Sequence, residues 1–249
     1  MSKYPHEGLC ALCRNHAILK DSHIIPAAAH KITKVNGKNV KSAPFSDQLD
    51  LKNQRDLKEF LLCENCETKF SVFENLAQKS LVKIWQLQPC DAALVEAESV
   101  NDLASLIHSV FWRASASKTI SYKLPPDLEE TLRRHLLTGT PLLFPRLPTR
   151  ITNVPMFNDI GSNAMVVSPA GRERRDGIVV SYFSIYGVLL CMHSPTAMFA
   201  ENKSDFLGGE PDDYFVKAPN ALDMFHLIDG ISAMQAQGIA DARGIKQNN

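Results

Sequence analysis

The residues best suited to chemistry are four of the six cysteines, because they form two Cys-x-x-Cys pairs. The pairs are Cys10/Cys13 and Cys63/Cys66, and 49 residues separate them. Each pair can grip a metal ion from a tight turn, and four thiolates complete the tetrahedral coordination that zinc prefers. We therefore predict one closed, structural Zn²⁺ site. Two unrelated surface turns, or a redox pair, are the alternatives.

The elements that must position these cysteines are a loop-rich N-terminal segment and a helix that begins at the second pair. Apolar residues recur at helical spacing from that pair to Gln86. Further helices are predicted over 100–118, capped by Asn101, over 127–137, closed by Thr138-Gly139, and over 221–239. Strands are predicted over 151–157, 164–167, 177–183 and 186–192.

These elements predict an α+β fold in two parts. Residues 1–88 would form a zinc-stabilised module. Residues 89–249 would hold a helical middle, an antiparallel strand-rich region and a closing helix. Hydrophobic residues make up 45% of the chain and charged residues 22%, which is typical of a globular protein.

The two parts carry charges of opposite sign. The whole chain has 27 Lys and Arg against 27 Asp and Glu, which excludes a uniformly cationic protein that coats nucleic acid. Residues 1–88, however, hold 13 Lys and Arg against 9 Asp and Glu. Four lysines between the cysteine pairs have no acidic residue among them and are candidates for phosphate contacts: Lys31, Lys34, Lys38 and Lys41. A solvated loop would need the same composition.

The sequence around the cysteine pairs resembles the zinc-containing HNH endonucleases. Ser22-His23-Ile24-Ile25-Pro26 follows the first pair, and Leu61-Leu62 precedes the second. A set of bacterial proteins with Ser-His-Ile-Ile-Pro and Leu-Leu-Cys-x-x-Cys-Glu-x-x-Phe-Ser-x-x-x-Glu is more similar still. The resemblance implies a ββα-metal fold, His23 as the general base for phosphodiester hydrolysis, and a catalytic divalent ion, commonly Mg²⁺. It also suggests a role in phage defence or mobile elements.

Two positions depart from the HNH pattern. Ser22 stands where the family usually has an Asp or His metal ligand, and Glu67 stands where Asn or His is usual. Glu67 is a good ligand for a hard metal ion. Asn53 is the best counterpart of the family's orienting asparagine, and Gln54 is the next. The expected catalytic set is therefore His23, Glu67 and Asn53. Glu74 lies on the same helix face as Glu67.

Three classes of function follow from these patterns. The first is an HNH-like nuclease that acts on nucleic acid. The second is a non-catalytic zinc module that binds nucleic acid or protein, and Ser22 is its main support. The third is a small-molecule binding or regulatory protein whose function lies in the strand-rich part. Residues 89–249 could also mediate a homo-oligomer or protein contact, and Arg113 within them is expected to be a surface charge.

The sequence predicts a cytoplasmic protein without a membrane partner. The first residues lack the apolar core of a signal peptide. The most apolar stretch, 178–192, is short and interrupted by polar residues. In a reducing cytoplasm, cysteines are expected to be free thiols or metal ligands rather than disulfides.

Overall fold

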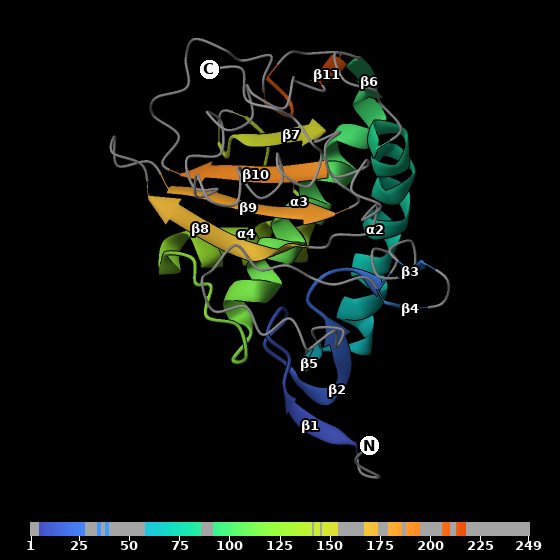
Figure 1. Cartoon of the computed structure of the whole chain (residues 1–249). Coiled ribbons are helices and arrows are strands. Elements are labelled where there is room, and N and C mark those ends of the chain that lie inside the picture. The colour runs from blue at the N-terminus through green and yellow to red at the C-terminus, as the bar shows by residue number, and fades with distance from the viewer. Residues whose placement is uncertain are drawn as a thin grey trace, which may run out of the picture.

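Helices and antiparallel sheets make up the described part of the chain (Figure 1). The computed structural model describes residues 5–27, 34–35, 38–39, 58–85, 92–140, 142–144, 146–153, 167–173, 179–185, 188–194, 206–209 and 213–217. Strand and helix segments occur together but do not alternate as βαβ units, so the predicted α+β class is confirmed.

A three-stranded antiparallel sheet forms the N-terminal end of the molecule. Its strands β1 (His6–Leu9), β2 (His16–His23) and β5 (Lys58–Cys63) lie in the order β1-β2-β5. Helix α2 (Glu64–Trp85) follows β5 without a loop, so the prediction of a helix from the second cysteine pair to Gln86 is confirmed to within a residue at its end. Glu64 and Glu67 in its first turn favour a helix start because acidic groups interact well with the positive end of the helix dipole.

Helix α3 (Ala97–Ala116) begins before the predicted cap at Asn101, and the prediction of that cap is wrong. The residue that precedes the helix, Glu96, ends strand β6 (Ala92–Glu96) and makes no capping hydrogen bond with its side chain. Strand β6 pairs with β11 (Asp213–Lys217), more than a hundred residues away in the chain. The helix therefore begins directly after a strand that pairs with a distant partner, and not at the cap that the local sequence indicates.

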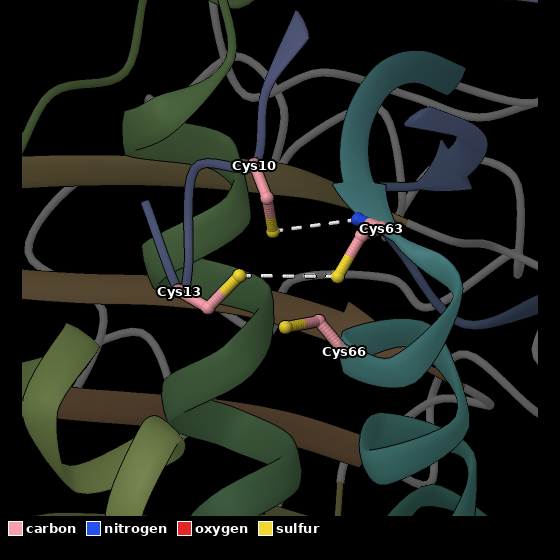
Figure 2. Close-up of side chains that lie close together, drawn as sticks. All are labelled: Cys10, Cys13, Cys63 and Cys66. Atoms are coloured by element: carbon pink, nitrogen blue, oxygen red, sulfur yellow. Dashed lines mark hydrogen bonds between the residues drawn. The ribbon is translucent and has the colours of Figure 1, made fainter. Parts of the chain in front are cut away.

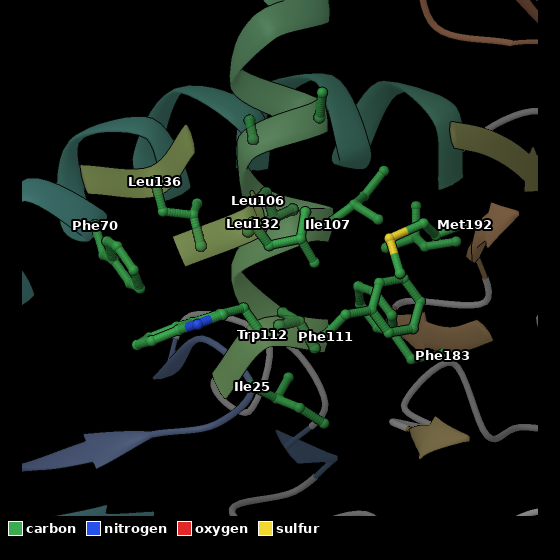
Figure 3. Packing of buried hydrophobic residues seen from close by; sticks show 14 of the residues in the cluster. Ile25, Phe70, Leu106, Ile107, Phe111, Trp112, Leu132, Leu136, Phe183 and Met192 are labelled. Atoms are coloured by element: carbon green, nitrogen blue, oxygen red, sulfur yellow. The ribbon is translucent and has the colours of Figure 1, made fainter. Parts of the chain in front are cut away.

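Helix α3 lies at the centre of the core and is buried along most of its length. Its Trp112 meets Phe70 of α2 edge-on at 6.2 Å between ring centroids. On the other side Phe111 meets Phe183 of the four-stranded sheet at 5.0 Å (Figure 3). One continuous cluster of buried side chains therefore extends from the cysteine end to the four-stranded sheet. Whether 1–88 and 89–249 are separate domains stays a prediction.

Helix α4 (Pro126–Thr138) packs against α3 and ends as its sequence predicts. Pro126 occupies the first helical position, where a missing N–H is tolerated. Gly139 adopts a left-handed conformation with φ 76°, and its N–H donates to the His135 carbonyl at 2.8 Å. This is the common C-terminal glycine cap, so the predicted closure at Thr138-Gly139 is confirmed.

The second large sheet has the strand order β7-β10-β9-β8 and packs against α3 (Figure 1). Its strands overlap the four predicted spans and are displaced along the chain: β7 (Thr149–Asn153), β8 (Val167–Glu173), β9 (Val179–Ile185) and β10 (Val188–Ser194).

The largest displacement among these four strands concerns β8, which shares only Val167 with the predicted strand 164–167. Pro169 and Gly171 in this strand would normally indicate a turn. Because β8 is an edge strand and its register shifts between Val167 and Ala170, the proline removes no ladder bond that the sheet needs.

Two predictions fall partly or wholly outside the described residues. The closing helix over 221–239 lies outside them. The described residues of the lysine-rich stretch are two short paired strands, β3 (Lys34–Val35) and β4 (Lys38–Asn39). Lys31 and Lys41 lie outside the described residues.

Candidate metal centre

The first cysteine pair lies in the loop that joins β1 to β2. The Cys10 N–H donates to the Asn15 carbonyl at 2.9 Å, and the Arg14 N–H donates to the Cys10 carbonyl at 2.8 Å. Arg14 adopts φ 61°, a left-handed conformation that non-glycine residues seldom occupy. These bonds close a tight turn that directs Cys10 and Cys13 toward the same point.

The second pair spans the junction between β5 and α2, because Cys63 ends the strand and Cys66 lies in the first helical turn. Two hydrogen bonds attach the first pair to this junction. The Ala11 N–H donates to the Leu61 carbonyl at 3.0 Å, and the Cys63 N–H donates to the Cys10 sulfur at 3.3 Å.

The four sulfur atoms lie within 4.8 Å of one another and point inward (Figure 2). A zinc–sulfur bond of about 2.3 Å in tetrahedral geometry implies sulfurs about 3.8 Å apart. The Cys13 and Cys63 sulfurs are 3.9 Å apart, and all four cysteines are free. The four cysteines could therefore hold a metal ion, in a geometry compatible with structural zinc and with no coordination position left for substrate.

Charge also favours a cation at this point. Burial raises the pKa of the Cys66 thiol, and the neighbouring thiols raise it further. Burial also opposes ionisation of Cys10, yet the N–H groups of Cys13, Cys63 and Leu12 outweigh it and lower the pKa of Cys10. Four sulfurs this close together, three of them from buried cysteines, cannot all ionise without a positive charge, whereas a bound divalent ion deprotonates its thiols outright.

Helix α4 contacts the loop of the first cysteine pair. Arg133 donates to the Leu12 carbonyl at 2.5 Å and to the Glu130 carboxylate at 2.8 Å. Glu130 also accepts from Arg14 at 2.6 Å and from Arg134 at 2.9 Å. Hydrogen bonds from Arg133 and Arg134 lower the pKa of Glu130 to about 2. The loop of the first cysteine pair is thus supported by a helix from the second half of the chain.

Ser22, the departure from the HNH pattern, is buried and bonded to the backbone. The register of β2 and β5 shifts between Lys20, which pairs with Leu62, and Asp21, which pairs with Phe60. The Ser22 hydroxyl accepts from that N–H at 3.2 Å and donates to the Lys20 carbonyl at 3.3 Å. The Ser22 hydroxyl is therefore bonded to the strand backbone, and its oxygen does not serve as a metal ligand.

Replacing Ser22 with alanine should destabilise the protein by about 1–3 kcal/mol, because the buried Leu62 N–H would lose its acceptor. Urea unfolding at pH 7 measures this loss. Ser71→Ala is the matched control, because Ser71 is exposed and its hydroxyl bonds to the Thr68 carbonyl of its own helix. Equal stability of the two variants would contradict the role assigned to Ser22.

His23 ends β2, and Glu67 lies in the first turn of α2. One carboxylate oxygen of Glu67 is buried and has no hydrogen-bond partner among the described residues. His23 is half-buried and pairs with Lys58 in the β2–β5 ladder. Asn53 and Gln54 lie outside the described residues, so their place beside His23 stays a prediction.

Glu74 faces Arg113, a residue whose role the sequence did not indicate. Arg113 is not a surface charge, because its side chain is only 2% exposed and pairs with the Glu74 carboxylate. Burial raises the pKa of Glu74, although the Arg113 guanidinium opposes the rise. The sequence places this arginine within the apolar run of α3, and that position is the available sign that the side chain lies in the core. Only its neighbours in space reveal why it is buried.

The described residues gather three or more metal-binding side chains at one place, the four cysteines. His23 and Glu67 form no such group with a third acidic, histidine or cysteine ligand from the same residues. Among the described helices, none is long and apolar enough to cross a membrane.

We compared the chain with models of protein families, with curated proteins and with solved structures, and none of the three comparisons gave a match. The fold and site by themselves define an α+β protein with a candidate four-cysteine metal centre at the junction of a small sheet and a helix.

Proposed function

We propose that the protein is an HNH-like, metal-dependent nuclease that hydrolyses phosphodiester bonds of nucleic acid. The observation that carries the proposal is the antiparallel β2–β5 pair followed directly by α2. In this unit His23 stands at the end of the first strand, and Glu67 stands in the first helical turn beside the four cysteines. That order matches the strand–strand–helix order that the HNH resemblance implies.

In the proposed reaction the His23 imidazole takes the proton of a water that attacks the phosphorus. A neutral imidazole is suited to this task near pH 7. A bound divalent ion would polarise the phosphate and stabilise the leaving 3′-oxygen. Glu67 fits such an ion because one of its carboxylate oxygens is buried and has no hydrogen-bond partner among the described residues. One carboxylate is enough for Mg²⁺, which commonly keeps several waters and binds substrate phosphate.

The proposed substrate is a nucleic acid approached through the basic N-terminal segment. The lysines at 31, 34, 38 and 41 would contact phosphates and so contribute affinity without reading sequence. We propose a cytoplasmic setting, where reducing conditions keep cysteines available to bind zinc.

A second candidate is a non-catalytic zinc module that binds nucleic acid or a protein. Two observations favour it. The Ser22 hydroxyl is engaged with the strand backbone, so the usual ligand before the general base has no replacement there. Glu74 is paired with Arg113 and is not available to a metal ion.

His23→Ala should reduce cleavage by about 100-fold or more if His23 is the general base. Supercoiled plasmid DNA and a structured RNA, each with Mg²⁺ or Mn²⁺, measure the rate. His16→Ala is the matched control, because His16 lies on the same strand and is exposed.

Both variants should keep the zinc content of the wild type. Cleavage by His23→Ala at the wild-type rate would refute the assigned base. Binding of nucleic acid by a wild type that cleaves neither substrate would favour the non-catalytic module.

A further inference from the structure

The Arg113 side chain joins three elements at the end of β2. Its Nη1 donates to the His23 carbonyl at 2.7 Å, and its Nη2 donates to the Glu74 carboxylate and to the Ser109 hydroxyl at 3.1 Å. Its Nε donates to the Ser109 carbonyl at 3.3 Å. The guanidinium also lies 5.3 Å from the centroid of the Phe70 ring. Each guanidinium nitrogen thus has an acceptor within the protein.

Because each of its guanidinium nitrogens already donates to an acceptor in the protein, Arg113 is unsuited to binding a phosphate. A substrate phosphate would have to displace Glu74 or a backbone carbonyl, and the side chain is only 2% exposed. The planar fork of an arginine is instead well suited to fixing several acceptors in one relative geometry. The role that fits Arg113 is therefore to position other groups.

The group it positions is the main chain of His23. This residue ends β2, and the next two residues, Ile24 and Ile25, are buried in the core. The hydrogen-bonded ladder between β2 and β5 therefore ends at His23, the residue whose imidazole the proposed reaction uses. The bond from Arg113 holds the His23 carbonyl where the ladder ends.

The same guanidinium connects this carbonyl to the helix that carries Glu67. Glu74 lies two turns after Glu67 on α2, so the two residues share one face of this helix. Arg113 thus ties the end of β2 to α2 from a third element, α3.

We infer that Arg113, paired with Glu74, is a positioning residue that sets His23 relative to α2. The nuclease centre is then completed by α3 and is not contained within residues 1–88. This inference rests on the proposed function, since it assigns Arg113 a part in the same site.

The deciding variant is Arg113→Lys in the full chain. Lysine keeps a positive charge beside Glu74 but cannot hold His23, Glu74 and Ser109 together in a fixed fork. We expect kcat to fall by roughly 100-fold with KM little changed, because a small displacement of a catalytic group has that effect. The zinc content should equal that of the wild type. Arg134→Lys is the matched control, because Arg134 is 74% exposed and should keep full activity.

The NMR signals of the His23 imidazole and the Ile24 amide provide a readout that does not need cleavage. Both should shift in Arg113→Lys and stay in place in Arg134→Lys. A variant with wild-type kcat and unshifted signals would overturn the inference and leave the nuclease proposal intact. If the wild type itself fails to cleave, the nuclease proposal fails, and the NMR signals alone decide whether Arg113 positions His23.

A variant that loses zinc or unfolds would be replaced by the double variant Glu74→Gln with Arg113→Gln. That pair leaves no buried charge without a partner but removes the fork from His23. It should show the same loss of kcat and the same shifted signals. Wild-type kcat or unshifted signals in this double variant would equally overturn the inference.

Discussion

Cys63→Ser should abolish tight zinc binding and unfold the N-terminal sheet together with the start of α2. Structural zinc contributes about 10–16 kcal/mol to the folding of finger peptides, which is comparable to the roughly 5–15 kcal/mol stability of a typical domain. The Cys63 sulfur is one of four that converge, so serine at this position removes one of the four ligands. The buried side chains of the same cluster, Leu12 and Phe70 among them, would then lose their packing.

Metal analysis of the purified protein and thermal unfolding followed by circular dichroism test this expectation. The wild type should hold one zinc per chain, and a strong zinc chelator should reproduce the effect of Cys63→Ser. Cys191→Ser is the matched control, because Cys191 is a free cysteine on β10, a strand of the other large sheet. Full zinc occupancy in Cys63→Ser would contradict the assignment of the four cysteines as ligands.

Arg113→Met should destabilise the protein by about 3–5 kcal/mol, the usual effect of removing one partner of a buried ion pair. The Glu74 carboxylate, only 15% exposed, would remain without its counter-charge, and the His23 carbonyl would lose its donor. Adding Glu74→Leu should recover much of the loss, since no charge then remains in the pair. Urea unfolding at pH 7 with constant zinc measures the wild type and both variants.

The pH dependence of the stability deficit provides a second test of this prediction. Burial already raises the pKa of Glu74, and loss of Arg113 should raise it further. The folded variant then binds a proton more readily than the unfolded chain, so its deficit should shrink as the pH falls. Arg134→Met, at an exposed position, should change stability by no more than about 0.5 kcal/mol. An equal effect of the two arginine variants would contradict the buried network.

The convergence of the four cysteines and the helices α2 and α4 are the parts that sequence reasoning reached. Two Cys-x-x-Cys pairs indicate a metal site because each pair binds from a local turn, and any fold that brings the pairs together suffices. The helix from the second pair and the glycine cap at Gly139 also follow from local rules. The strands were displaced by a few residues, because their ends depend on which partner they pair with.

What the tertiary structure alone decided is the surroundings of His23. From the sequence, Ser22 is interpreted as a lost metal ligand, whereas in the fold its hydroxyl accepts a hydrogen bond from the Leu62 N–H. Arg113 reads as a surface charge, yet it is buried against Glu74, 39 residues away in the chain. The physical reason is the same in each case. Spacing along the chain determines which ligands one turn can present, but the partner of a buried polar group is set by elements that meet only after folding.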